Sequence, residues 1–243
     1  NEYIKMVPTI LVRGFPAPKF IFRGFTFFSS CISTVFGLVG IGLGSIYIYL
    51  VNPDIVHKTY FYPVHIFRRR TKKVLTIYDM IHEKFPSDFP LNDKTAKYKK
   101  LAASSADHII CISESTRRDV IDILGVEPSR TSVVYLGFNS FTPLQSVPND
   151  MLHFFSTPYL LYVGQRGGYK NFEKFIRAYV ESKSLNEVFK VICFGGGFFT
   201  AKEIRVMSDL GINQNVVLQI SGNDQLLGHF YKNATAFIYP SLY

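Results

Sequence analysis

The chain has 243 residues, of which 47% are hydrophobic, so it can bury a sizeable core in one large or two small domains and is not disordered. Its formal net charge of +9 favours an anionic partner, such as a nucleotide phosphate, an acidic glycan or an anionic membrane surface. Basic and aromatic residues do not interleave as they do in nucleic-acid-binding modules, which argues against nucleic acid as a partner. The 3 cysteines lie in apolar contexts without paired spacing, so we expect neither a disulfide framework nor a zinc site, and we expect a reducing compartment.

The N-terminal part contains a long uncharged stretch. Residues 24–53 include no Asp, Glu, Lys or Arg, and a membrane-spanning helix needs only about 20 apolar residues. Ser and Thr dilute the first half of the stretch, and a strand-like segment follows at once from Asp54, which favours a buried helix that leads into a strand. A face that contacts a membrane is the alternative, and the basic run at residues 68–73 would suit anionic lipid.

From residue 54 onward, strand-like and helix-like segments alternate. The expected strands cover residues 54–57, 74–80, 108–113, 132–136, 159–163, 189–194, 216–220 and 235–239. The expected helices cover residues 93–105, 114–124, 171–184, 200–210 and 224–233. Such alternation predicts βαβ units and a parallel sheet, and a segment rich in Pro, Ser and Asn near residues 138–157 predicts a linker between two sets of units. We therefore expect an α/β fold with two Rossmann-like lobes, an N-terminal lobe over residues 1–140, a linker over 141–157 and a C-terminal lobe over 158–243.

The clearest chemical pattern is at residues 158–172, with the sequence PYLLYVGQRGGYKNF. Uncharged residues 159–163 predict a buried parallel strand, which ends at Gly164 in a glycine-rich turn. Arg166 and Lys170 place two cations beside a helix whose first turn should hold Asn171, and helix N-termini attract anions. The turn is therefore a candidate diphosphate site. A structural turn without a ligand is the alternative, because the G-x-G-x-x-G dinucleotide pattern is absent.

Ligands of open parallel sheets bind outside the carboxyl ends of the strands. In this chain we expect that edge to be formed by the turns at Asp79, Ser113, Gly164, Gly195 and Ser241. Several of these turns carry polar residues or glycine, and two lobes that faced one another would make a cleft.

Several stretches, taken in order, resemble the retaining glycosyltransferases of family 4, which have the two-lobed GT-B fold, and especially their mannosyltransferase-like members. The matching stretches are PDIVH at 53–57, TIYDMIHEKFP at 76–86, ADHIICISESTRRDVIDILGV at 106–126, SVVYLGF at 132–138, YLLYVGQRGGYKNFEKFIRAY at 159–179, the glycine turn at 194–197 and ATAFIYPSLY at 234–243. The resemblance covers residues from about 53 to 243, and the combination of motifs is far more specific than any one of them.

The resemblance implies transfer of a hexose, with mannose favoured, from a nucleotide diphosphate sugar to an acceptor hydroxyl with retention. GDP-mannose is the favoured donor, and a lipid-linked molecule or a polysaccharide is the expected acceptor. Arg166 and Lys170 would hold the diphosphate and stabilise its charge as the bond to the sugar breaks, so that no metal or other cofactor is needed. Gly195 and Gly196 would let backbone amides approach the nucleotide, and a tight structural turn is the alternative for them.

In the N-terminal lobe, the resemblance makes His57, Asp79 and His82 candidates for contact with the transferred sugar or the acceptor. Many members of the family carry histidine where Tyr78 stands, and often a second one where this chain has Thr59. A hydrogen-bonded structural role is the alternative for both histidines.

Three further polar residues would line the cleft together with Tyr78, namely Ser113, Glu114 and Ser241. Ordinary helix capping is the alternative for Ser113. Members of the family continue after the Pro-Ser-Leu-Tyr stretch into Glu-Gly-Phe-Gly, whereas this chain stops at Tyr243 and does not begin with Met. We therefore expect a fragment, truncated at both ends, that is inactive by itself.

The expected location is the cytoplasm, with peripheral contact at the inner face of the membrane. Two other interpretations stay open from the sequence. One is a different GT-B enzyme, such as a sugar-nucleotide epimerase, and the other is a non-catalytic, membrane-associated remnant. A dinucleotide oxidoreductase is the weakest interpretation, since the fingerprint and its acidic ribose partner are missing.

Overall fold

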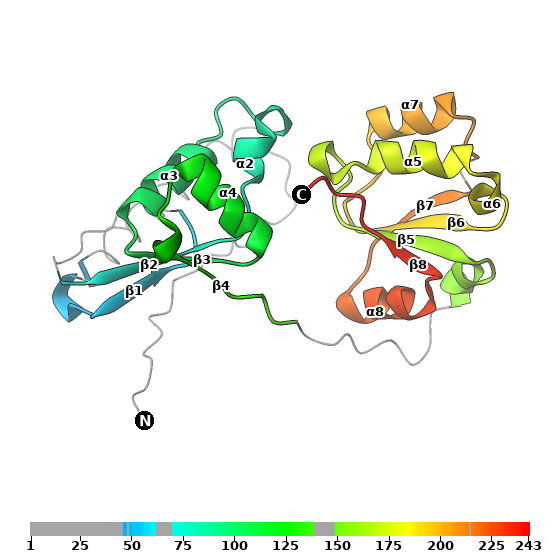
Figure 1. Cartoon of the computed structure of the whole chain (residues 1–243). Coiled ribbons are helices and arrows are strands. Elements are labelled where there is room, and N and C mark those ends of the chain that lie inside the picture. Colours follow the sequence, from blue (N-terminus) through cyan, green and yellow to red (C-terminus); the bar gives the residue numbers. More distant parts are fainter. Residues whose placement is uncertain (1–45, 48, 62–69, 139–148, 214) are drawn as a thin grey trace, which may run out of the picture. The chain divides into compact units, whose positions relative to one another are not determined.

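The structure is a computed structural model that describes residues 46–47, 49–61, 70–138, 149–213 and 215–243. Its chain divides into two compact units (Figure 1). The first unit comprises the described part of Asn1–Met80 together with Lys94–Tyr135, and the second comprises Ile81–Asp93 together with the described part of Leu136–Tyr243. A short segment that lies between two parts of the first unit in the sequence therefore belongs to the second.

The first unit is a four-stranded parallel sheet in the order β1-β2-β3-β4. Its strands are β1 (Ile55–Lys58), β2 (Lys72–Ile77), β3 (His108–Cys111) and β4 (Thr131–Val133). Its helices are α3 (Thr95–Ser105), α4 (Glu114–Leu124) and the short 3-10 helix η2 (Pro128–Arg130). Figure 1 shows α3 and α4 on the same side of the sheet. Leu75, Ile109 and Val120 have no exposed surface, so the core lies between the central strands and α4.

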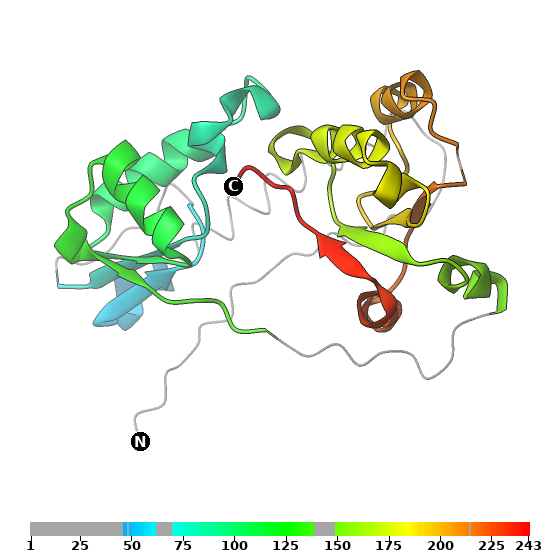
Figure 2. The same ribbon diagram turned by 45° about the vertical axis from the view of Figure 1, so that its right-hand side comes forward.

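The second unit has its own four-stranded parallel sheet, in the order β7-β6-β5-β8. Its strands are β5 (Tyr159–Val163), β6 (Lys190–Phe194), β7 (Val217–Ile220) and β8 (Ala236–Ile238). Its helices are α2 (Ile81–Lys84), α5 (Phe172–Glu181), α6 (Lys183–Asn186), α7 (Ala201–Asp209) and α8 (Asp224–Asn233), with the 3-10 helices η1 (Pro86–Asp88), η3 (Asn149–Phe155) and η4 (Gly168–Lys170). Helices α5 and α7 cover one face of the sheet and α8 covers the other (Figures 1 and 2).

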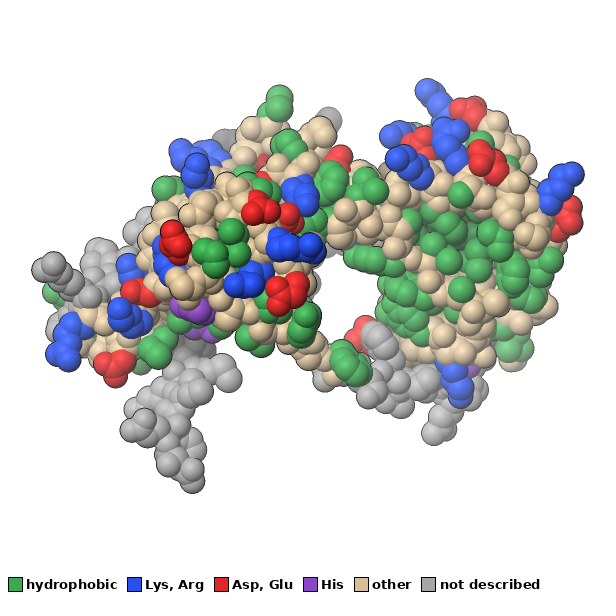
Figure 3. Space-filling model, in the orientation of Figure 1, with side chains coloured by type: hydrophobic (Ala, Val, Ile, Leu, Met, Phe, Trp, Pro, Cys, Tyr) green, Lys and Arg blue, Asp and Glu red, His purple; other side chains and the backbone are tan. Residues whose placement is uncertain are grey.

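Each face of the second sheet has a separate hydrophobic core. The alternation of side chains along β5 sends Leu160 and Tyr162 to the cluster that contains Ile176 of α5. Tyr159 and Leu161 point to the opposite cluster, which contains Phe230 of α8. Because β5 is buried on both faces, its sequence is uniformly uncharged rather than alternating. Hydrophobic side chains also lie on the visible face of this unit between α5 and α8, below the charged side chains of α5 and α7 (Figure 3).

The expected α/β fold with two parallel sheets is confirmed, and the bounds of β5, α4 and α8 agree with the sequence prediction. The helix expected over residues 171–184 is different. Asn171 has a left-handed backbone with φ of 59° and precedes α5, and Ser182 separates α5 from α6. The 3-10 helix η4 lies within the turn that we predicted to be glycine-rich.

Part of the sequence analysis lies outside the described residues. Most of the uncharged stretch at 24–53 lies outside the described residues, and of its described residues 46–47 and 49–51 are helical and exposed. The basic run at 68–73 is described only from residue 70, and the expected linker only from residue 149. Within the described part of the chain, every helix is too short or too polar to cross a bilayer.

Candidate functional site

The carboxyl ends of the second unit's strands bring together residues that are far apart in the sequence. Val163 of β5 pairs with Phe194 of β6, and Tyr162 pairs with Ile238 of β8. The residues that follow these strands therefore lie at one edge of the sheet, and the amide of Gly164 donates to the carbonyl of Phe194 at 2.9 Å. Gly164 has a φ of 100°, which explains why glycine ends β5. The turns predicted at Gly164, Gly195 and Ser241 share this edge.

Lys170, in the 3-10 helix η4, is held by two tyrosines at this edge. Its ammonium donates to the phenolic oxygen of Tyr239 at 2.9 Å and lies 5.0 Å and 5.1 Å from the ring centres of Tyr169 and Tyr239. A cation within about 6 Å of an aromatic face is attracted by the ring. Lys170 therefore has a defined position. The bond to Tyr239 uses only one of the three protons of the ammonium, which leaves two for other acceptors.

The residues after β8 are tied to the same turn. The side-chain amide of Asn171 donates to the carbonyl of Pro240 at 3.1 Å, and the backbone amide of Leu242 donates to the carbonyl of Tyr169 at 2.9 Å. The Ser241 hydroxyl donates to the same carbonyl over 3.5 Å. Asn171 and Ser241 thus fasten the basic turn to the end of β8, and both have a structural function here.

The turn at η4 is also contacted by the segment Ile81–Asp93, which belongs to the same unit. The Asp88 carboxylate accepts a hydrogen bond from the backbone amide of Tyr169 at 2.7 Å. The rings of Phe85 and Phe89 stack on the Tyr169 ring, with centres 5.6 Å and 6.5 Å away. Sequence analysis did not identify Asp88 as a partner of this turn, because nothing local in the sequence relates residues 81 positions apart.

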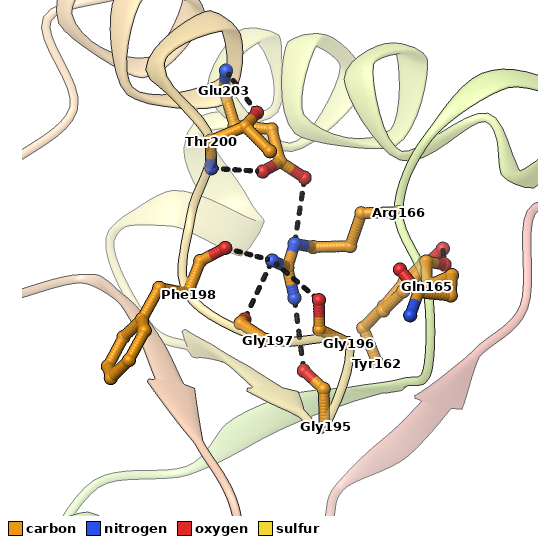
Figure 4. A network of polar contacts seen from close by, with 9 residues as sticks. All are labelled: Tyr162, Gln165, Arg166, Gly195, Gly196, Gly197, Phe198, Thr200 and Glu203. Carbon is orange, nitrogen blue, oxygen red and sulfur yellow. Dashed lines mark hydrogen bonds and ion pairs between the residues drawn. The ribbon is translucent and has the colours of Figure 1, made fainter. Parts of the chain in front are cut away.

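Arg166 is buried, with only 5% of its surface exposed, and its guanidinium bonds to the protein itself (Figure 4). Its Nε donates to Glu203 Oε1 at 2.8 Å. Its terminal nitrogens donate to the carbonyls of Gly195 at 3.1 Å, Gly197 at 2.9 Å and Phe198 at 3.0 Å, with a longer contact of 3.5 Å to Gly196. We predicted that Arg166 would contact a diphosphate directly, but in the structure its donors are directed into the protein.

Glu203 is itself fixed by the start of α7. Its carboxylate accepts from the backbone amide of Thr200 at 2.6 Å, and the Thr200 hydroxyl accepts from the amide of Glu203 at 3.2 Å, which makes a capping box. Burial acts to raise the pKa of Glu203, but the hydrogen bonds from Thr200 and Arg166 together outweigh it and keep the pKa below its ordinary value. The carboxylate is therefore charged at neutral pH.

At the carboxyl edge of the first unit's sheet, Asp79 is held by a buried lysine. The Lys99 ammonium, which has no exposed surface, donates to the Asp79 carbonyl at 2.8 Å and lies 3.7 Å from Asp79 Oδ1. The backbone carbonyl of the adjacent Tyr78 accepts from the Thr116 hydroxyl at 3.2 Å. Sequence analysis missed Lys99, which looked like one more solvated residue of a basic helix.

The remaining candidates of the first unit have mainly structural partners. His57 Nε2 lies 2.8 Å from the Thr76 hydroxyl on the neighbouring strand. The Ser113 hydroxyl accepts from the amide of Thr116 at 3.1 Å and so caps α4. Glu114 lies 3.8 Å from Arg117 on the exposed face of the same helix. These contacts support the structural alternatives for His57 and Ser113 without assigning either of them a ligand.

His82 belongs to the second unit, unlike the other two candidates for the transfer step, His57 and Asp79. Its ring stacks on Phe89 with centres 3.9 Å apart, and its Nε2 lies 4.0 Å from Asp93. Its buried Nδ1 has no hydrogen-bond partner among the described residues. The structure therefore does not bring the three predicted catalytic residues together within one unit.

Residues 15–140, more than half of the chain, match the family model described as Glycosyltransferase Family 4. The chain belongs to that family. Residues 152–243 of this family 4 protein match a second model, described as Glycosyl transferases group 1. No curated protein sequence matches the chain.

Solved structures agree with the family 4 assignment at the level of the fold. A glycosyltransferase from Rickettsia africae ESF-5 is 16% identical with a TM-score of 0.55, and the alignment covers 83% of this chain and 55% of that one. WaaG, a glycosyltransferase involved in lipopolysaccharide biosynthesis, is 17% identical with a TM-score of 0.57 and coverages of 84% and 57%. TarM is 14% identical with a TM-score of 0.56 and coverages of 83% and 40%. The family 4 protein therefore has the GT-B fold and spans about half the length of these structures.

Proposed function

We propose that this family 4 protein binds a nucleotide diphosphate sugar at the carboxyl edge of its second sheet and transfers a hexose to an acceptor hydroxyl with retention. One observation carries the proposal most directly. The Lys170 ammonium is held by Tyr169 and Tyr239 in the turn that follows β5, at the edge of the sheet that also carries the glycine turn after β6. A fixed cation next to glycine backbone is the arrangement that a diphosphate needs.

The chemical role of Lys170 follows from where charge develops. When the bond between the anomeric carbon and the phosphate oxygen breaks, the electron pair stays on the nucleoside diphosphate, and the acceptor oxygen forms the new bond as its proton is released. A positive charge fixed beside the diphosphate stabilises that leaving group more than it stabilises the intact donor. In this proposal Lys170 supplies the charge that a metal ion supplies in other enzymes, so the reaction needs no metal.

On the first sheet, we propose that Asp79 serves the transferred sugar or the acceptor. Its backbone is fixed by Lys99 at the end of β2, and its side chain stays about one-third exposed. GDP-mannose is our proposed donor, and a lipid-linked molecule or a polysaccharide is our proposed acceptor, with activity at the cytoplasmic face of a membrane. The net charge of +9 supports an anionic donor and an anionic surface nearby.

The proposal is tested by calorimetric binding of GDP, UDP and ADP to the protein and to two variants. Lys170→Ala should weaken binding of the preferred nucleotide by roughly ten- to a hundredfold, the loss of a charge-assisted hydrogen bond. Lys174→Ala is the matched control, because Lys174 is exposed on α5, the helix that follows η4, and its loss changes the net charge equally. If the protein binds none of the three nucleotides, or if both variants bind as the unchanged protein does, the assignment of the diphosphate site is wrong.

A further inference from the structure

Tyr169, the residue before Lys170, is held in three ways within the second unit. Its backbone amide donates to the Asp88 carboxylate at 2.7 Å, and its carbonyl accepts from the amide of Leu242 at 2.9 Å. Its ring stacks on that of Phe85, with centres 5.6 Å apart. Because the peptide units on both sides of Tyr169 are planar, these contacts fix the backbone from which the side chain of Lys170 extends.

The side chain of Lys170 depends on Tyr169 as well. Its ammonium lies 5.0 Å from the centre of the Tyr169 ring, close enough for the ring to attract the cation. A shift of the Tyr169 ring would therefore move the surface on which the ammonium rests. The charge that we assign to the diphosphate is thus placed by a residue that Asp88 holds in turn.

The turn has the shape that the Asp88 carboxylate needs in order to reach this amide. Gly168 has a φ of 54°, in the left-handed region that favours glycine. A Cβ added to Gly168 would also overlap the Asp88 carboxylate. Glycine at this position therefore permits both the backbone of the turn and the close approach of Asp88. A carboxylate is a stronger acceptor for the Tyr169 amide than a neutral oxygen.

Asp88 comes from a distant part of the chain. The segment Ile81–Asp93 belongs to the second unit, yet it follows directly on the end of β2, where Asp79 lies. We propose that Asp88 is a positioning residue of the diphosphate site, which holds Tyr169 so that the Lys170 ammonium stays in place for the nucleotide. This inference rests on the proposed function and adds to it a residue that acts through Tyr169.

The same geometry allows a competing role for Asp88, with an effect of opposite sign. A carboxylate on the backbone of this turn could instead occupy the place of a phosphate oxygen. Asp88 would then compete with the nucleotide, and its removal would tighten binding. The removal of a positioning residue has the opposite effect, because a Lys170 that is held less firmly binds the diphosphate more weakly.

The experiment measures calorimetric binding of GDP, UDP and ADP to Asp88→Ala and Asp88→Asn. The Ala variant removes the acceptor, and binding of the preferred nucleotide should weaken by about fivefold, the effect of one hydrogen bond. The Asn variant keeps an oxygen that can accept from the Tyr169 amide, so its binding should stay close to that of the unchanged protein. Asp209→Ala and Asp209→Asn are the matched controls, because they make the same changes at an exposed position of α7.

Hydrogen exchange of the Tyr169 amide tests the structural step separately, because Asp88 is the acceptor of this amide. The amide should exchange faster in Asp88→Ala than in the unchanged protein, and Asp88→Asn should restore most of the difference. Circular dichroism checks folding. If Asp88→Ala does not fold, Phe85→Leu decides, since it removes the ring that stacks on Tyr169 and keeps an apolar side chain, and it should also weaken binding.

The outcomes separate this inference from the proposed function. If Lys170→Ala weakens binding but Asp88→Ala does not, the diphosphate site stands and the positioning role of Asp88 is overturned. Tighter binding by both Asp88 variants would show competition with the nucleotide and would overturn it too. The same holds if Asp88→Asn binds as weakly as Asp88→Ala, or if the Tyr169 amide exchanges at the same rate without Asp88. If the protein binds none of the three nucleotides, the proposed function fails and this inference fails with it.

Discussion

The ammonium of Lys170 donates a hydrogen bond to the phenolic oxygen of Tyr239, 2.9 Å away, and the two residues are 69 positions apart in the sequence. This bond connects the turn after β5 with the end of β8, two neighbouring strands of the second sheet. The Tyr239 ring also lies under the ammonium, with its centre 5.1 Å away. Tyr239 thus acts on the position of Lys170 through its hydroxyl and through its ring, and substitution can separate the two contributions.

Tyr239→Phe removes the phenolic oxygen and keeps the ring. We expect nucleoside diphosphate binding to weaken by roughly fivefold, because a single hydrogen bond contributes about 1 kcal/mol. Tyr239→Leu removes the ring as well and should weaken binding further, since the cation–π attraction is also lost. Calorimetry measures both effects, with Tyr135→Phe as a control at an exposed tyrosine of the first unit. Equal affinities for the Phe and Leu variants would show that the ring has no part in holding Lys170.

Lys99→Met is expected to destabilise the protein. The variant fills a similar volume but removes the donor that bonds to the Asp79 carbonyl and the charge beside its carboxylate. The loss should reach about 2 kcal/mol in the free energy of unfolding, as for other hydrogen bonds from a charged group. Urea unfolding measures it, and Lys100→Met, at an exposed neighbour on α3, is the control. A variant as stable as the unchanged protein would mean that Lys99 adds no net stability at Asp79.

Stability should fall in mild alkali because of buried thiols and phenols. Burial raises the pKa of Cys111 from 9.0 to about 11, and that of Cys193 from 9.0 to about 12. Above pH 9 the unfolded chain releases these protons while the folded protein retains them. The folded state then binds more protons, so the free energy of unfolding decreases as pH rises, by at most about 1.4 kcal/mol per pH unit for each thiol.

Urea midpoints between pH 8 and pH 11 test this directly. The protein with both Cys111→Ala and Cys193→Ala will be less stable at every pH, because cavities are created, but its loss of stability should begin later. The buried tyrosines then set the onset, since burial raises the pKa of Tyr162 from 10.0 to about 12 and also raises the pKa values of Tyr159, Tyr179 and Tyr231. If the loss of stability begins at the same pH with and without the cysteines, Cys111 and Cys193 are not its cause.

Ser113 is expected to act through helix capping alone. Ser113→Ala should lower the free energy of unfolding by about 1 kcal/mol, because the amide of Thr116 loses its acceptor. Ser113→Asp should restore most of that stability, since aspartate caps helices as well as serine does. If the Asp variant is stable but has lost sugar transfer in an activity assay, Ser113 has a role beyond capping.

The sequence predicted the elements whose ends carry a local signal. Helix α4 was predicted at its observed bounds because Ser113 caps it and Gly125, with a φ of 67°, ends it. Strand β5 was found because an uncharged run followed by Gly164 marks a strand buried on both faces. The start of α5 was placed one residue early, because an asparagine is an ordinary residue of a helix start and nothing in the sequence shows a left-handed backbone.

The candidate site was predicted less well, because the sequence shows which charges are present and not where they point. Lys170 and Arg166 looked alike as cations in one turn, yet the first lies near the surface of the turn and the second is buried against Glu203. The contacts of Lys99 with Asp79 and of Asp88 with Tyr169 depend on how distant segments pack. No local pattern encodes such pairings.

The turn at Gly195, Gly196 and Gly197 has no side chain beyond a hydrogen atom and so presents only backbone to its surroundings. Backbone groups are the same for every residue, so they cannot distinguish a guanine from a uracil or an adenine. Under the proposed function, affinity for the diphosphate and preference among nucleotide bases must therefore be encoded in different places. A change of donor could then arise by substitution outside the turn, while Gly195, Gly196 and Gly197 stay as they are.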